Sequence, residues 1–217
     1  MKMLPIAILG TGGFAREVAT IVHAINANSP TYELLGYVDN NTAKGTLING
    51  IPVIGNDTEI NNTRNSLGLI LAFGEPHLKE RVRAKYNNVL ISFPTIIHPS
   101  VIMGDPSSIK IGEGCIICAG NVLTTNIEIN DFVTLNLACT VGHDAVIGKF
   151  SSFMPSCNIS GEVIVENKVY CGTGVKIINQ VQIGDNAVIG AGAVVTQNIP
   201  ANCTAVGIPA KPIKFIK

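Results

Sequence analysis

Residues 141–165 read VGHDAVIGKFSSFMPSCNISGEVIV, and the spacing within this stretch decides the fold. A large apolar residue recurs at every sixth position, and a small or branched residue stands four positions after each of them. The first series runs without insertion through Ile111, Ile117, Leu123, Ile129, Leu135, Val141, Ile147, Phe153, Ile159, Val165, Cys171, Ile177, Ile183, Ile189 and Val195. The second series is Cys115, Asn121, Ile127, Val133, Cys139, Ala145, Ser151, Cys157, Val163, Val169, Val175, Val181, Ala187, Ala193 and Ile199. Because a helix turns every 3.6 residues, a period of six cannot stay on one helical face, and it predicts short strands joined by tight turns.

Three such strands close one triangular coil of 18 residues, so residues 111–200 make five coils. Stacked at about 4.8 Å per coil, they form a prism roughly 24 Å long. An opening turn at 97–103 precedes the regular coils, and 104–110 shifts the register by two residues. The narrow interior accepts small inward residues, which explains a chain with 47% hydrophobic residues but only 5% aromatics and no Trp. Four cysteines stand at inward positions and are interpreted as structural thiols: Cys115, Cys139, Cys157 and Cys171.

Composition excludes several classes of protein. The 217 residues carry 15 basic and 15 acidic side chains, so the formal net charge is zero, whereas an electrostatic nucleic-acid binder needs a basic excess. No stretch approaches the roughly 20 apolar residues of a membrane span, and Met1–Leu9 is too short for a signal peptide, so we expect a cytoplasmic protein. Residues 111–200 hold only 10 of the 30 charged side chains, which burial of prism faces in a trimer would explain. Cys115-x-x-Cys118 has no partner pair, so neither a zinc site nor a redox site is favoured.

Residues 1–94 follow a different pattern, in which apolar strands alternate with helices. An apolar strand at 6–9 runs into a glycine-rich turn, and an amphipathic helix follows it. This alternation predicts a small, mainly parallel, Rossmann-like sheet. Further strands are expected at 34–38, 51–54, 68–73 and 89–92, and a second helix at 76–86.

The turn Gly10-Thr11-Gly12-Gly13 has the form of a phosphate cradle. Glycine permits close backbone approach, and a helix N-terminus offers unpaired N–H groups. Asp39 follows the second strand, at a position where a carboxylate accepts hydrogen bonds from ribose hydroxyls. Because 94 residues supply about half of a doubly wound sheet, a nucleotide-sugar fits better than a full dinucleotide. An NAD-dependent enzyme stays an alternative that rests on the glycine turn alone.

Of four histidines, His143 is the candidate for chemistry. It follows Val141-Gly142, which places it at a corner of the prism, and Asp144 follows it. An imidazole held by a carboxylate is a general base at neutral pH; the alternatives are a surface histidine and an ordinary turn aspartate. A carbonic anhydrase of this fold needs three histidine ligands, and no second histidine occurs within 111–200, so no metal is expected. The other three are interpreted as solvated or turn-capping residues: His23, His77 and His98.

These segments together resemble the NeuD/PglD-type sugar O- and N-acyltransferases over nearly the whole chain. The stretches that carry the resemblance are Gly10–Val18, Tyr37–Asn40, Gly50–Gly55, Ala72–Gly74, Ile97–Ser100, Asn136 with His143-Asp144, Gly190–Val195 and Val206–Lys211. The resemblance implies a Rossmann-like nucleotide-sugar domain at 1–94 and a left-handed parallel β-helix acyltransferase domain with a C-terminal tail at 95–217. It also implies a homotrimer that binds acetyl-CoA between neighbouring prisms.

The resemblance assigns roles to residues at matching positions. It implies that His143 is the base, Asp144 its orienting carboxylate and Asn136 a supporting residue. The acetyl-CoA groove would contain Gly161, Thr173, Gly190 and Ala191, and the nucleotide-sugar cradle Gly10, Thr11, Gly12, Gly13, Phe14, Asp39, Asn40 and Gly74. Phe14 and Ser152 depart from the pattern, because related proteins often carry histidine at both positions.

The expected reaction is direct transfer of acetyl from acetyl-CoA to the 4-amino group of a nucleotide-linked 4-amino-4,6-dideoxy sugar, in polysaccharide biosynthesis. O-acetylation of a sialic-acid-type sugar uses the same base and stays an alternative. A noncatalytic nucleotide-sugar-binding scaffold is an alternative of another class, although the His143-Asp144 pair argues against it.

Overall fold

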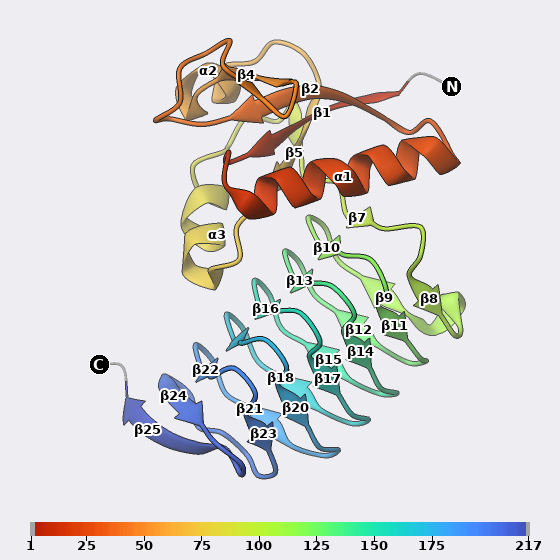
Figure 1. Cartoon of the computed structure of the whole chain (residues 1–217), viewed down its shortest axis with the longest axis vertical. Helices are drawn as coiled ribbons and strands as arrows, with labels where there is room; N and C mark the ends of the chain where they lie inside the picture. Colours follow the sequence, from red (N-terminus) through yellow and green to blue (C-terminus); the bar gives the residue numbers. More distant parts are fainter. Residues whose placement is uncertain (1–2, 216–217) are drawn as a thin grey trace.

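The computed structural model describes residues 3–215 and contains an α/β region followed by a left-handed parallel β-helix, as the sequence predicted (Figure 1). The α/β region has a six-stranded sheet in the order β3-β4-β2-β1-β5-β6, in which only the β3–β4 pair is antiparallel. Its strands are β1 (Leu4–Leu9), β2 (Tyr32–Val38), β3 (Leu47–Ile48), β4 (Ile51–Gly55), β5 (Leu67–Leu71) and β6 (Ile91–Ser92). Its helices are α1 (Gly13–Asn28), α2 (Asp57–Asn61) and α3 (Pro76–Arg83).

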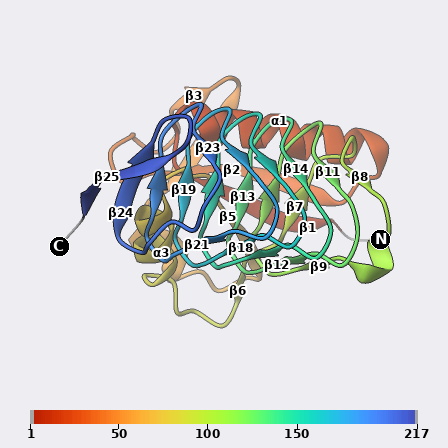
Figure 2. The same ribbon diagram turned by 90° about the horizontal axis from the view of Figure 1, so that it is seen from below.

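The β-helix has three faces, each a ladder of two-residue strands in register. Face I contains β7 (Ile96–Ile97), β10 (Ile116–Ile117), β13 (Thr134–Leu135), β16 (Ser152–Phe153), β19 (Tyr170–Cys171), β22 (Val188–Ile189), β24 (Cys203–Val206) and the antiparallel β25 (Lys211–Phe215). Face II contains β8 (Ile102–Met103), β11 (Val122–Leu123), β14 (Thr140–Val141), β17 (Asn158–Ile159), β20 (Lys176–Ile177) and β23 (Val194–Val195). Face III contains β9 (Lys110–Ile111), β12 (Glu128–Ile129), β15 (Val146–Ile147), β18 (Ile164–Val165) and β21 (Gln182–Ile183). Figure 2 shows these coils stacked in sequence order.

The inward positions of the prism agree with the six-residue pattern. All residues of both series are buried except Ile111, which is half-buried at the open end and packs against the same core. The four inward cysteines are fully buried and free, and burial raises the pKa of the Cys115 thiol to about 11, so these thiols pack as small apolar groups. The predicted register shift is real, and the short 3₁₀ helix η1 (Pro106–Ser108) absorbs it.

Each corner of the prism is a four-residue turn whose third residue has a left-handed backbone. Phe132, Asp144 and Glu162 occupy that position with φ of 59°, 59° and 58°, although the left-handed region costs about 1 kcal/mol or more for a residue with a Cβ. Hydrogen bonds between coils compensate: the N–H of Phe132 donates to the Glu113 carbonyl, and that of Glu162 to the His143 carbonyl, both at 2.8 Å. Each corner is named by the two faces that it joins, so the chain passes from face I to face II at the I/II corner, and then through the II/III and III/I corners.

The α/β region packs on face I and on the III/I corner of the prism (Figure 1). Helix α1 shares a buried cluster with Ile116 and Cys118 on the outside of face I. Near α3, a chain of aromatic rings crosses the boundary, and in it Phe132 stacks on Phe150 with centroids 5.0 Å apart. Two buried apolar clusters thus join the α/β region to its own prism.

Some local elements differ from the sequence expectations. The helix expected at 76–86 ends at Arg83, and the strand expected at 89–92 is reduced to Ile91–Ser92, because Val89 is 95% exposed. Helix α2 and strand β3 were not predicted. Helix α2 is too short to show a period, and it forms because Asn56 and Glu59 make a reciprocal capping box.

Lys79 of α3 is buried within the contact between α3 and the prism. Its Nζ donates to the Phe132 carbonyl at 2.7 Å, the Thr134 hydroxyl at 3.1 Å and the Ser151 carbonyl at 3.2 Å. The residue is only 1% exposed, and this burial lowers the pKa of Lys79 from 10.5 to about 7. Three acceptors on two successive coils of the prism therefore fix the position of α3.

We expect replacement of Lys79 by Met to change how stability depends on pH. Between pH 7 and about 10 the unfolded chain holds the Lys79 proton while the folded chain releases it, so the free energy of unfolding of the wild type rises with pH. The variant lacks this increase. Urea titrations at about pH 7 and about pH 9 measure the difference, with Lys44→Met at an exposed lysine as control. An identical pH dependence in wild type and Lys79→Met would contradict the buried, titrating amine.

Candidate functional site

His143 stands at the II/III corner of the prism and projects from it. Its side chain is 56% exposed, and its Nδ1 lies 2.8 Å from Asp144 Oδ2. The Asp144 N–H donates to the Thr125 carbonyl of the preceding coil at 3.2 Å, which fixes the carboxylate beside the ring. The hydrogen bond with His143 holds the pKa of Asp144 below its usual value. A carboxylate that accepts from Nδ1–H leaves Nε2 as the unprotonated nitrogen.

Gly161, one coil further along the same corner, provides room for the imidazole. A Cβ at Gly161 would lie 2.5 Å from both Cε1 and Nε2 of His143, and the glycine is not in the left-handed region. Its lack of a side chain is therefore explained by the ring that lies against it. The family resemblance implied a place for Gly161 in the acetyl-CoA groove. The structure adds that Gly161 lies against His143.

The corners of the prism differ in how many of their backbone N–H groups are paired with side chains. At the III/I corner, side chains of the next coil accept from the second corner residue, as Asn167 Oδ1 does from the Lys149 N–H at 2.9 Å. Within residues 3–215, the N–H groups of Gly161, Thr173 and Ala191 donate to no acceptor. Gly161 lies at the II/III corner beside His143, whereas Thr173 and Ala191 are stacked on successive coils of the I/II corner.

Two of the residues assigned to the β-helix site have structural contacts. Gly190 donates its N–H to the Ala205 carbonyl at 2.9 Å, and a Cβ there would lie 2.7 Å from Val206 Cγ1. Asn136 is 7% exposed, and its Oδ1 accepts from the Leu137 N–H at 2.7 Å. Asn136 belongs to the I/II corner, so one chain does not bring it together with His143.

The glycine turn after β1 leaves the N-terminus of α1 open. Gly12 is the N-cap, no side chain caps the helix, and no acidic residue stands in its first turn. A Cβ at Gly12 would meet nothing within 4 Å. The turn therefore presents uncapped N–H groups, which is the arrangement that favours an anion.

Asp39 lies next to this turn, on the neighbouring strand. Its Oδ2 accepts from the Thr11 hydroxyl at 2.9 Å, and its Oδ1 accepts from the N–H groups of Asn41 and Thr42 at 2.8 and 2.9 Å. Burial alone would raise the pKa of Asp39, but these hydrogen bonds hold it below its usual value. The predicted glycine turn and the Asp39 carboxylate therefore lie side by side. The carboxylate is an anionic acceptor, and the turn carries the uncapped N–H groups of the helix end.

The other residues assigned to the cradle lie around it. Asn40 points to α2, where its amide donates to Asp57 Oδ2 at 2.9 Å, and Phe14 is half-buried in the α1 cluster. Gly74 follows β5 and approaches the prism, since a Cβ there would lie 3.6 Å from Met154 Cε. Ser152, where related proteins often carry histidine, is fully buried on face I, and its hydroxyl has no partner among the described residues.

The cradle and His143 lie on opposite sides of the molecule. The α/β region covers face I, and the II/III corner that carries His143 is the corner opposite that face.

Among residues 3–215 no cluster of His, Cys, Asp and Glu can hold a metal ion, and no helix there is long and apolar enough to span a membrane. Ser100 donates its N–H to His98 Nδ1 at 3.1 Å, so His98 caps a turn.

Comparison with known proteins identifies the class. The family described as the PglD N-terminal domain matches residues 5–86. GDP-perosamine N-acetyltransferase of Escherichia coli O157:H7 is 30% identical over 214 residues, which cover 95% of each chain. The crystal structure of PerB from Caulobacter crescentus in complex with CoA and GDP-perosamine is similar with a TM-score of 0.88 and 29% identity, covering 98% of this chain and 99% of that one. The acetyltransferase domain of PglB from Neisseria gonorrhoeae in complex with acetyl coenzyme A also has a TM-score of 0.88 and 29% identity, covering 98% and 100%.

A left-handed β-helix of hexads that follows a small nucleotide-binding α/β region defines a hexapeptide-repeat acyltransferase. The chain belongs to the NeuD/PglD-type family of acetyl-CoA-dependent sugar N-acetyltransferases. Acetyl-CoA is the co-substrate, and it supplies the acetyl group.

We expect Gly161→Ala to displace the His143 ring while leaving the coil intact, because the new methyl group occupies the space of Cε1 and Nε2. Imidazole NMR resonances and a crystal structure of the variant report the ring position and its contact with Asp144. Ser160→Ala, one residue earlier and exposed, is the matched control. An imidazole that keeps its wild-type position in Gly161→Ala would contradict the steric role of this glycine.

Proposed function

We propose that this enzyme acetylates the 4-amino group of a nucleotide-linked 4-amino-4,6-dideoxy sugar, with His143 as the general base. The observation that carries the proposal is the His143-Asp144 pair, whose free Nε2 lies against Gly161 and its unpaired N–H. The similar proteins from E. coli and C. crescentus are named for GDP-perosamine, and perosamine is a sugar of this class.

The reaction proceeds by direct attack. Nε2 of His143 accepts a proton from the acceptor amine while the amine nitrogen bonds to the thioester carbonyl carbon of acetyl-CoA. The Gly161 N–H is the proposed donor to the oxyanion that forms on the carbonyl oxygen. When the C–S bond breaks, the proton on Nε2 passes to the departing CoA sulfur. Atoms and charges balance without a covalent acyl-enzyme.

Backbone donors support the placement of the acetyl-CoA. Its pantetheine arm carries two amides, and amide carbonyls match the stacked free N–H groups of Thr173 and Ala191 at the I/II corner. The Gly190 N–H already donates to the Ala205 carbonyl. Gly190 therefore offers no donor to acetyl-CoA, and its role is to leave room where a side chain would stand.

The separation of the two half-sites on one chain supports a homotrimer. The α/β region is fixed to face I by the α1 cluster and by Lys79, so the cradle of one chain cannot reach the opposite corner of its own prism. A neighbouring prism that presents its II/III corner supplies the missing base. In this arrangement Asn136 of one chain also lies beside His143 of the next, which one chain alone does not allow.

The nucleotide half of the acceptor fits the cradle. Its diphosphate lies on the uncapped start of α1 at Gly12 and Gly13, and its ribose hydroxyls donate to Asp39. The same site serves a noncatalytic sugar-binding scaffold, but a scaffold gives no reason for an exposed histidine paired with a carboxylate.

The test is turnover of His143→Ala with acetyl-CoA and a panel of GDP-, UDP- and dTDP-linked 4-amino-4,6-dideoxy sugars, with CoA thiol release as the signal. We expect the variant to lose about 10²–10⁴-fold in kcat, because proton removal by a positioned base contributes this much. His23→Ala, at an exposed histidine on α1, is the control and should match the wild type.

Wild-type-like turnover of His143→Ala would exclude it as the base. If the wild type acetylates only hydroxyl acceptors, the O-acetyltransferase alternative replaces the proposed amine acceptor.

A further inference from the structure

The II/III corner repeats one backbone hydrogen bond from coil to coil. The N–H of the third corner residue donates to the carbonyl of the second corner residue one coil earlier. Asp144 donates in this way to Thr125 at 3.2 Å, and Glu162 to His143 at 2.8 Å. Each turn of this corner therefore stands on the turn before it, and the turn that carries His143 stands on the turn at Thr125.

Asn126, the third residue of that earlier turn, lacks the corresponding backbone partner. The spacing of the later turns would give its N–H the carbonyl of residue 107, which lies within the register-shifting helix η1. The Asn126 N–H donates instead to the hydroxyl oxygen of Ser108, at 3.0 Å. A side chain of η1 therefore takes the place of the carbonyl that supports the later turns.

The Ser108 hydroxyl uses all of its hydrogen-bonding capacity at this point. It donates to the Asp105 carbonyl at 3.0 Å, and its oxygen lies 2.9 Å from Thr125 Oγ1. Because a hydroxyl has one donor and two acceptor lone pairs, the Thr125 hydroxyl and the Asn126 N–H both donate to Ser108. The half-buried Ser108 thus fixes the two central residues of the turn that supports Asp144.

Hydrogen bonds, not packing, orient the His143-Asp144 pair. The two side chains are 56% and 49% exposed, so neighbouring atoms leave them free to turn. Hydrogen bonds with the His143 side chain and then with the Asn126 side chain hold the pKa of Asp144 below its usual value. The carboxylate that orients the imidazole is therefore itself oriented from the preceding coil.

We infer that Ser108 and Asn126 are positioning residues for the His143-Asp144 pair, with η1 as the fixed point from which the pair is oriented. The inference rests on the proposed function, in which His143 is the base, and it extends that function by two residues that act through Asp144. A fixed carboxylate keeps the imidazole proton on Nδ1 and leaves Nε2 free to accept a proton. A carboxylate that turns away allows the ring to carry its proton on Nε2, where it cannot act as a base.

Ser108→Ala tests the anchor, with the imidazole nitrogen resonances of His143 as the primary measurement. We expect the fraction of the neutral ring with its proton on Nδ1 to fall, because the turn below Asp144 loses its fixed point. With acetyl-CoA and GDP-perosamine, kcat should fall about three- to tenfold while KM for acetyl-CoA changes by less than about twofold, since a misplaced base affects the chemical step. Ser108→Thr keeps the hydroxyl and should restore the wild-type tautomer and turnover.

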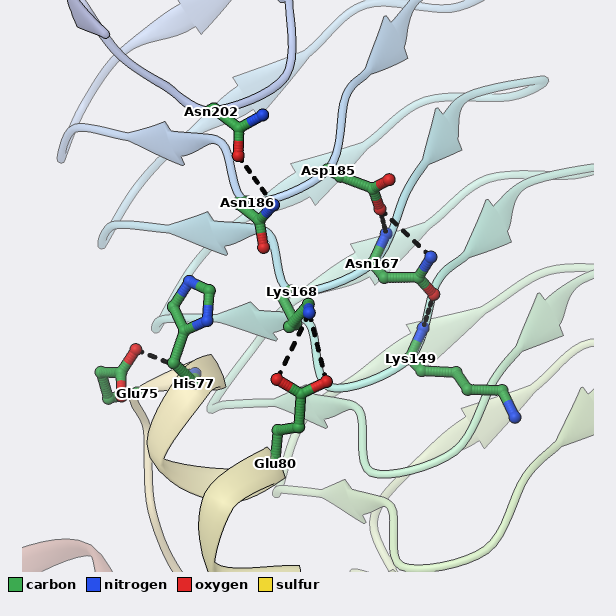
Figure 3. Close-up of polar contacts among 9 residues, drawn as sticks. All are labelled: Glu75, His77, Glu80, Lys149, Asn167, Lys168, Asp185, Asn186 and Asn202. Atoms are coloured by element: carbon green, nitrogen blue, oxygen red, sulfur yellow. Dashed lines mark hydrogen bonds and ion pairs between the residues drawn. The ribbon is translucent and has the colours of Figure 1, made fainter. Parts of the chain in front are cut away.

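Asn126→Gly tests the amide separately from the anchor. Glycine keeps the left-handed backbone of the turn, so the variant removes the side chain alone, and the Nδ1–H fraction of His143 should fall again. Asn202→Gly is the matched control at the III/I corner. Asn202 has φ of 55°, and its Oδ1 accepts from Asn186 Nδ2 at 2.8 Å (Figure 3). This control should leave the His143 tautomer unchanged.

The tautomer and the turnover separate the two hypotheses. An unchanged Nδ1–H fraction in both Ser108→Ala and Asn126→Gly overturns the positioning role, whatever the effect on turnover, and leaves the proposed function intact. If the wild type transfers acetyl to no nucleotide-linked 4-amino sugar, the proposed function fails. A lowered Nδ1–H fraction in the two variants would then still support their role in orienting the pair.

Discussion

The hydrogen bonds that join each coil of the prism to the next are the constraint on which the rest of the structure depends. Within the regular coils each strand residue pairs with the residue 18 positions away, as Thr140 does with Asn158 and Val141 with Ile159. An insertion within the regular coils would break these ladders on all three faces. Two register shifts interrupt this spacing: η1 takes up the one before β9, and after β23 the chain is two residues shorter, so that Ile183 pairs with Ile199 and Val188 with Thr204. Side chains at one corner therefore repeat along the prism at the spacing between strands, about 4.8 Å.

This fixed spacing explains why the candidate active site consists of so few residues. His143 and Gly161 are 18 positions apart, so the ring of one lies over the backbone of the other, and only glycine leaves room for it. The third corner shows the alternative, because asparagine and aspartate side chains there accept from the corner N–H groups. Where such side chains are missing, the donors stay free for a ligand. At the III/I corner side chains pair the N–H groups of Glu113, Lys149, Asn167 and Asp185, on the same backbone as the other two corners.

The repeat made most of the fold predictable from the sequence. A six-residue period over residues 111–199 fixes which side chains point inward, and the buried residues agree with it. The glycine turn with Asp39 was also predictable, because strand, turn and helix signals are local. Lys79 was not, since its acceptors lie 53 to 72 residues away. Asn136 shows the limit of transferring roles by resemblance: it follows Leu135 and so stands one corner before His143, and the supporting role given to it requires a second chain.

The way the α/β region is attached to the prism decides where catalysis takes place. Its interface is apolar at α1 and closed by three hydrogen bonds of Lys79 at α3, so it resists the hinge motion that would carry the cradle around the prism. A short or polar linker contact would permit such motion. With this attachment, a nucleotide-sugar bound at the glycine turn would stay on the face I side of its own chain. Under the proposed function, acetyl transfer then depends on association of chains, since only a neighbouring prism brings a II/III corner to face I. Under the same proposal, the small number of charged residues in the prism has the same origin, because surfaces that carry half of an active site would also pack against one another.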